Sequence, residues 1–159
     1  YYSNFSPRQL FLLVKDIEKY PEFLPWCSTS RVEEVSPSEL RAELVIKFSM
    51  MMEKYVSKVS LEEPKEEKSI CSVDVEAIEG PFKTLVNNWK FEYDSDHDQT
   101  KITFHLAFEF QSKFLQKLIG AIFEEALKKM LKCFEASELQ RREYCRGCVA
   151  AVWEPPKTP

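Results

Sequence analysis

Hydrophobic residues between positions 111 and 142 recur every three or four positions, which is the period of an amphipathic α-helix. The apolar stripe consists of Leu115, Leu118, Ile119, Ile122, Phe123, Ala126, Leu127, Met130, Leu131 and Phe134. On the opposite face, Glu124 precedes Lys128 by four residues, a spacing and order that stabilise a helix. At a rise of about 1.5 Å per residue, the predicted helix is long enough to cross a small sheet.

Between residues 28 and 110 the hydrophobic period changes to two, which is typical of strands with one buried and one wet face. The clearest alternating segments are residues 41–48, 55–61, 71–77, 85–93 and 102–110, and residues 32–35 are a further candidate. Turn-forming residues separate several of these segments, at 36–38, 62–67 and 94–98. The polar residues expected on the buried face are Tyr55, Asn87 and Tyr93, with no carboxylate or imidazole among them.

Two shorter helical segments precede the strands. Ser6 and Pro7 form a typical helix start, and Leu10, Phe11, Val14 and Ile17 supply an apolar stripe up to Lys19. In the following segment, Tyr20–Cys27, two prolines leave room for a single helical turn that presents Phe23, Leu24 and Trp26.

This order of elements predicts an α+β fold in which an antiparallel sheet curls around the long C-terminal helix. Many inward positions of the sheet are aromatic, and two interpretations follow. Either the rings pack on the helix as an ordinary core, or the sheet and the helix enclose an apolar cavity for a small ligand. The periodicity alone does not choose between them. The apolar connection Met50–Met51–Met52 indicates either a buried bulge or a loop tip that contacts lipid.

The composition excludes several kinds of protein. A chain of 159 residues with a formal net charge of −4 fits a single domain and argues against a general binder of nucleic acid. No apolar run is long enough to span a bilayer. Five cysteines at irregular spacing indicate reduced thiols, and the lone pair Cys145 and Cys148 is interpreted as incidental, so neither a metal site nor a catalytic site is expected.

The stretch Tyr20–Cys27, which reads YPEFLPWC, resembles the coenzyme Q-binding protein family of the START-like group, which includes polyketide cyclases and dehydrases. Further similar stretches are residues 52–57, Trp89–Phe91 and Phe108–Phe110 leading into the last helix. The resemblance covers residues 1–142 and leaves 143–159 as a C-terminal tail. It implies the helix-grip (START-like) fold, a curved antiparallel sheet of about six or seven strands around a long C-terminal helix, with an elongated apolar cavity.

For function, the resemblance implies binding of ubiquinone or a polyisoprenoid precursor as cargo, without catalysis and without a catalytic cofactor. Such a carrier would contact a membrane peripherally and serve quinone-biosynthesis or respiratory complexes. The expected location is the matrix side of the mitochondrial inner membrane in a eukaryote, or the cytoplasmic periphery of the inner membrane in a bacterium.

The residues expected to bind the ligand are Trp26, Leu44, Ile46, Phe48, Tyr55, Val59, Asn87, Trp89, Phe91, Phe104, Phe108, Ile119, Ile122 and Phe123. The residues expected to form a gate at the membrane are Phe23, Leu24, Met50, Met51 and Met52. Two alternatives remain from the same resemblance. The first alternative is that of a bacterial branch of the family, a ribosome-associated inhibitor of translation. Such a role favours a basic surface, so the net charge of −4 argues against it without excluding it. A cyclase-like enzyme would need acid and base groups on the inward face.

Overall fold

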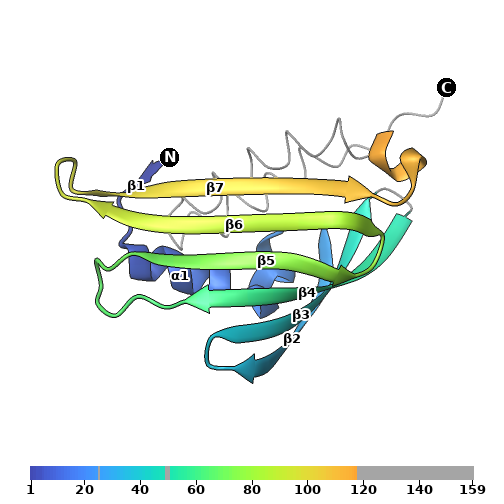
Figure 1. Cartoon of the computed structure of the whole chain (residues 1–159), viewed down its shortest axis with the longest axis horizontal. Coiled ribbons are helices and arrows are strands. Elements are labelled where there is room, and N and C mark those ends of the chain that lie inside the picture. The colour runs from blue at the N-terminus through green and yellow to red at the C-terminus, as the bar shows by residue number, and fades with distance from the viewer. Residues whose placement is uncertain (25, 49–50, 118–159) are drawn as a thin grey trace.

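The computed structural model describes residues 1–24, 26–48 and 51–117. Within these residues, seven strands form one antiparallel sheet in the order β1-β7-β6-β5-β4-β3-β2 (Figure 1). The elements are β1 (Tyr2–Ser3), α1 (Pro7–Lys15), the 3-10 helix η1 (Ile17–Lys19), α2 (Tyr20–Phe23), β2 (Cys27–Ser36), β3 (Glu39–Phe48), β4 (Met51–Glu62), β5 (Cys71–Glu79), β6 (Phe82–Asp94) and β7 (Gln99–Phe110).

Strands β2 to β7 pair with their neighbours in sequence, and β1 joins the outer edge of β7. Every strand predicted from the alternation is present, and the turns at 36–38, 62–67 and 94–98 connect strands as expected. Strand β2 is longer than the predicted 32–35, since it pairs with β3 from Cys27 to Ser36. As an edge strand it is mostly exposed, so alternation indicates only a short part of it.

Helix α1 begins with a capping box. The Ser6 Oγ accepts a hydrogen bond from the Gln9 backbone N–H at 3.2 Å, and the Gln9 side-chain oxygen accepts one from the Ser6 N–H at 2.9 Å. The helix ends at Lys15, and Ile17–Lys19 continue as a 3-10 turn, so the predicted helix through Lys19 is two elements. The single helical turn predicted next is α2.

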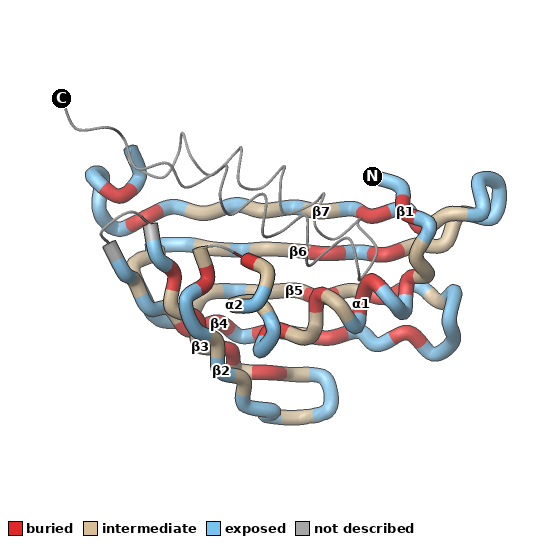
Figure 2. The backbone as a smooth tube through the Cα atoms, turned by 180° about the vertical axis from the view of Figure 1, so that it is seen from behind, coloured by how far each residue is buried: buried red, intermediate tan, exposed pale blue. Residues whose placement is uncertain are grey.

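The helices α1 and α2 lie on one face of the curved sheet, where α1 contacts β5 and β6 and α2 contacts β2 (Figures 1 and 2). The core combines Leu10, Phe11, Val14 and Ile17 of the helical segment with inward residues of the sheet. Among those are Ala42, Val59, Cys71, Val73 and Phe91. The apolar stripe predicted for residues 8–19 is thus buried, because it covers one part of the concave face of the sheet.

The predicted long helix lies largely outside the described residues. Residues 113–117 are helical, and the Ser112 Oγ accepts a hydrogen bond from the Leu115 N–H at 3.5 Å, as an N-cap does. Leu115, the first residue of the predicted stripe, is buried. Among the helices of the described residues, none is long and apolar enough to cross a membrane.

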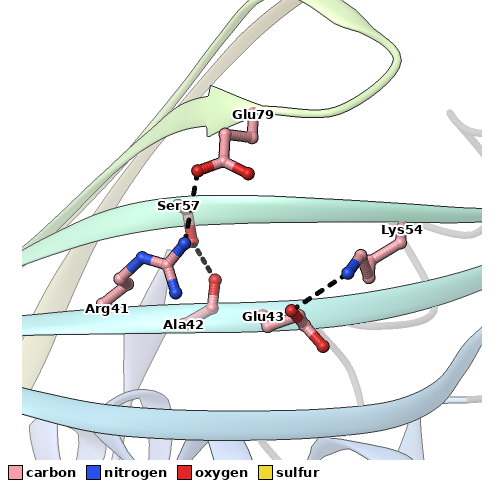
Figure 3. Close-up of polar contacts among 6 residues, drawn as sticks. All are labelled: Arg41, Ala42, Glu43, Lys54, Ser57 and Glu79. Atoms are coloured by element: carbon pink, nitrogen blue, oxygen red, sulfur yellow. Dashed lines mark hydrogen bonds and ion pairs between the residues drawn. The ribbon is translucent and has the colours of Figure 1, made fainter.

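The convex face of the sheet carries charged residues of both signs in cross-strand pairs. Arg41 of β3 lies 3.2 Å from Glu79 of β5, and Lys54 of β4 lies 3.3 Å from Glu43 of β3 (Figure 3). On the other side of the same strands, the buried Ser57 hydroxyl donates to the backbone oxygen of Ala42 at 3.5 Å. The pairs are exposed, so each contributes little to stability. Because each pair joins a cation to an anion, this part of the convex face is neither strongly positive nor strongly negative.

Candidate ligand-binding face

Because side chains alternate along each strand, the residues that share a face with the core follow from the register. The inward positions of β3–β7 are called the inner face below. They are Leu40, Ala42, Leu44, Ile46, Glu53, Tyr55, Ser57, Val59, Leu61, Cys71, Val73, Val75, Ala77, Phe82, Leu85, Asn87, Trp89, Phe91, Tyr93, Thr100, Ile102, Phe104, Leu106, Phe108 and Phe110. On β5 and β6 the inward residues near α1 are buried and those further away are half-buried, whereas the inward residues of β3 are buried from Leu40 to Ile46 (Figure 2).

A first group of rings lies beside the helix-covered core. The Trp89 ring centroid is 4.3 Å from that of Phe104 on β7 and 6.1 Å from that of Phe91 along the same strand. Trp89 and Phe91 are buried, whereas Phe104 is half-buried. All three were predicted to bind the ligand, and the structure brings them together as one aromatic wall.

A second group of rings lies at the opposite end of the inner face. Phe82 is at its centre, with ring centroids 5.3 Å from Tyr55, 4.7 Å from Phe110 and 6.4 Å from Phe108. Tyr55, Phe82 and Phe108 are half-buried. Phe82 was not among the predicted binding residues, because a bulge between Phe82 and Thr84 interrupts the alternation that indicated the others.

Asn87 lies between the two groups of rings. Its neighbours across the sheet are Val75 on β5 and Leu106 on β7, and along β6 it is flanked by Leu85 and Trp89. The side-chain oxygen Oδ1 is buried and has no hydrogen-bond partner among the described residues. An inward amide is either satisfied by neighbouring backbone or available to a ligand. The structure leaves its oxygen unsatisfied.

The inner face also holds a carboxylate, which corrects the sequence analysis. Glu53 pairs with Ile46 across β3 and β4, so its side chain is on the same side as that of Tyr55. The alternation is visible only from Tyr55 onward, so the pattern does not place Glu53 on the buried face. Glu53 is half-buried and lies at the end of β4 near the second group of rings.

The other predicted site residues fall into three sets. Leu44, Ile46 and Val59 are buried inward residues of β3 and β4. Of the predicted gate, Leu24 is buried in the core and Phe23 packs against it, as does Trp26, while Met52 is 58% exposed. Phe48 and Met51 pair with each other at the end of the β3–β4 ladder. The side chains of Phe48 and Met51, and the residues Met50, Ile119, Ile122 and Phe123, lie outside the described part of the structure.

Two thiols and two tyrosine hydroxyls on and near the inner face are held neutral by burial. Burial raises the pKa of the Cys27 thiol to about 11 and that of the Cys71 thiol to about 12. Burial likewise raises the pKa of the Tyr20 and Tyr55 hydroxyls. Neutral thiols are poor nucleophiles, so neither cysteine is activated for covalent chemistry.

No group of three or more histidine, cysteine or acidic residues in the described ranges is arranged to hold a metal ion. The pair Cys145 and Cys148 lies beyond those ranges. The two histidines, His97 and His105, are exposed and lie away from the inner face: His97 contacts Asp94 in the β6–β7 turn, and His105 points outward from β7. The inner face therefore offers apolar and aromatic surface, one unsatisfied amide and one carboxylate.

An apolar concave sheet face with helices on it is the architecture of the group that the sequence resembles, and comparison with known families agrees. The family model for polyketide cyclase / dehydrase and lipid transport matches residues 3–135. The chain belongs to this family. Its fold is the α+β helix-grip (START-like) fold, as predicted.

Two similar proteins of this family carry different kinds of name. The ribosome association toxin RatA of Rickettsia prowazekii is 39% identical over 131 residues, covering 82% of this chain and 87% of that protein. The mitochondrial coenzyme Q-binding protein COQ10 homolog B of Xenopus laevis is 31% identical over 135 residues, covering 83% of this chain and 53% of that protein. The resemblance to the coenzyme Q-binding proteins is thus confirmed, alongside a higher identity to the ribosome-association protein.

Solved structures agree with the fold. The 18 kDa protein CC1736 of Caulobacter crescentus is 31% identical and superposes with a TM-score of 0.66, covering 92% of this chain and 95% of that one. A START superfamily protein of Mycobacterium smegmatis is 19% identical with a TM-score of 0.59, covering 82% of this chain and 90% of that one. At 19% identity, this second likeness concerns the fold alone.

Proposed function

We propose that this protein binds a polyisoprenoid lipid, ubiquinone or a precursor of it, on its inner face and carries it as cargo. The observation that supports this most directly is the presence of two groups of rings, Trp89 with Phe104 and Phe82 with Tyr55, on an apolar face. Phe104, Phe82 and Tyr55 are only half-buried. Aromatic and aliphatic surface of this kind binds an isoprenoid chain because removing apolar surface from water is favourable by about 25 cal/mol per Å². The name of the coenzyme Q-binding relative supports the class of ligand.

Binding without turnover is part of the proposal. The inward thiols are neutral and buried, and Glu53 is the one carboxylate at the described inward positions of β3–β7. Cyclase or dehydratase chemistry needs an acid and a base within hydrogen-bond reach of the same substrate. The Asn87 amide is neither an acid nor a base, and burial raises the pKa of the Tyr55 hydroxyl, which makes it a weak acid beside Glu53.

A route between the inner face and a membrane is proposed at the end that carries the second group of rings. The β5–β6 turn lies against the start of the last segment there, since the Gln111 N–H donates to the Pro81 oxygen at 2.9 Å. Met52 and Phe114 are 58% and 65% exposed at this end, and the exposed lysines Lys47 and Lys113 lie close to them in sequence. Apolar residues beside lysines suit the surface of a membrane that contains anionic lipid.

A second candidate function is association with the ribosome, and the observation that favours it is the 39% identity to the Rickettsia protein over nearly its full length. Such an association would use the outward surface and leave the inner face free. The ion pairs Arg41 with Glu79 and Lys54 with Glu43 neutralise much of the described convex face, so a contact with ribosomal protein suits it better than one with RNA.

The test of the carrier function is organic extraction and mass spectrometry of the folded protein purified from a host that makes ubiquinone. Near-stoichiometric ubiquinone or a prenylated precursor is expected, and its absence together with failure to bind added decylubiquinone would contradict the proposal. In parallel, the protein is sedimented with purified ribosomes at physiological salt. Co-sedimentation that survives a wash at about 0.5 M salt supports the second function, and loss at low salt opposes it.

A further inference from the structure

The buried oxygen of Asn87 is unusual for a protein interior, where more than nine in ten buried polar groups have a hydrogen-bond partner. A buried acceptor without a donor is unfavourable, because the oxygen has lost its water and gained nothing in exchange. A polar residue at this position therefore needs a reason, and an apolar residue would fit the neighbouring positions better.

The described neighbours of Asn87 do not donate a hydrogen bond to its oxygen. Its neighbours on the inner face are Val75, Leu106 and Leu85, all aliphatic, and Trp89. A water molecule held inside a protein usually makes about three hydrogen bonds to polar groups, which these side chains do not offer. A bound molecule that carries a donor would satisfy Oδ1 where the described residues do not.

We infer that Asn87 binds a hydroxyl group of the cargo, so that the protein takes a prenylated hydroquinone or hydroxyarene in preference to the oxidised quinone. The inference rests on the proposed function and identifies the chemical class of its ligand. Its position supports it, because Asn87 lies between the Trp89 and Phe82 groups of rings, where an aromatic head group has a ring on either side along the face.

The chemistry of the amide distinguishes the two redox forms. A hydroxyl donates its proton to Oδ1 and accepts a hydrogen bond from the Asn87 NH₂, so it satisfies both ends of the side chain. The carbonyl and methoxy oxygens of an oxidised quinone are acceptors only. They satisfy the NH₂ and leave Oδ1 buried without a donor, whichever way the amide is turned.

The experiment measures the affinity of the full chain, freed of co-purified lipid, for decylubiquinone and for its reduced quinol by anaerobic isothermal titration calorimetry. One neutral hydrogen bond predicts that the quinol binds about threefold to tenfold more tightly. In Asn87→Leu the two forms should bind with equal affinity. Asn88→Leu is the matched control, because Asn88 faces outward and donates to Asp74 at 2.7 Å, and it should keep the preference.

The outcomes separate this inference from the proposed function. Equal affinity of the unaltered protein for quinol and quinone overturns the inference and leaves cargo binding intact. A preference for the quinol that persists in Asn87→Leu also overturns it, since another group then makes the distinction. Failure to bind either form contradicts the carrier function, and the inference falls with it. The preference of the unaltered protein is informative even if Asn87→Leu does not fold.

Discussion

Gly80, in the β5–β6 turn, lies directly against the backbone of Tyr55 on β4. A β-carbon at position 80 would be 2.6 Å from the Cβ of Tyr55, 2.8 Å from its Cα and 2.9 Å from the Lys54 backbone oxygen. Gly80 also has a φ of 126°, a conformation that residues with side chains rarely adopt. The close approach brings the turn onto the sheet where Tyr55 and Phe82 form the second group of rings.

Gly80→Ala should therefore lower the free energy of unfolding by about 2–4 kcal/mol, because it adds both backbone strain and a clash with backbone atoms that cannot rotate away. Urea unfolding followed by circular dichroism measures the change. Thr84→Ala, an exposed substitution in the next strand, is the control and should stay within about 0.5 kcal/mol. A Gly80→Ala variant as stable as the control would show that the turn relaxes freely.

Asn87→Leu should raise the stability of the ligand-free protein by about 1 kcal/mol, since it removes a buried acceptor without a partner and adds apolar surface among aliphatic neighbours. The same variant is expected to lose its preference for the quinol. A gain in stability together with a loss of ligand preference is expected when a residue serves binding at the expense of stability. Thermal unfolding without ligand is the measurement. A lower melting temperature would mean that the amide has a structural partner.

Trp89→Phe should weaken binding of decylubiquinone about threefold to tenfold with the fold preserved, because it shortens the aromatic wall and leaves Phe91 and Phe104 in place. Trp89→Ala is less informative, because Trp89 is only 4% exposed and its truncation costs about 3–5 kcal/mol. Calorimetric titration gives the affinity, with far-ultraviolet circular dichroism as the check on folding. Unchanged affinity would exclude Trp89 from the binding face.

Met52→Asp combined with Phe114→Asp should reduce binding to vesicles that contain about 30% anionic lipid by tenfold or more, since both apolar side chains would be replaced by charges that the membrane repels. Flotation of the protein with vesicles is the measurement. Ile70→Asp is the matched control, because Ile70 is 48% exposed in the β4–β5 connection at the other end of the strands. An equal loss in the control would contradict a localised contact.

Stability should decrease as the pH rises above about 9. Burial holds the pKa of Cys27 at about 11 and that of Cys71 at about 12, against an ordinary value of 9.0, so the folded protein keeps protons that the unfolded chain releases. The unfolded state then binds fewer protons, and the free energy of unfolding falls with rising pH, whereas below pH 9 these groups add no slope. Urea midpoints at pH 7, 9 and 10.5 test this, and Cys71→Ala should flatten the decline. An unchanged midpoint at pH 10.5 would contradict the burial of the thiols.

Much of the fold could be predicted from the sequence, because each strand carries its own alternation and α1 its own cap. The inward side chains of Leu44, Val59, Trp89 and Phe104 followed from the same pattern. Glu53 and Phe82 were missed for different reasons. Glu53 lies before the part of β4 in which alternation is visible, and Phe82 is separated from its strand by a bulge. Leu24, predicted at a gate, is buried in the core, because α2 packs against β2.

The sequence by itself determined the order of the elements and which residues point inward, because hydrophobic period is a local property of each segment. Only the tertiary structure decided that the Asn87 oxygen has no partner in the described part of the chain and that Asn87 lies between two groups of rings. Both facts depend on three strands at once, through the registers that pair Asn87 with Val75 and Leu106. Registers are set by turn lengths and bulges between strands, so the environment of one inward side chain is not contained in the pattern of its own strand.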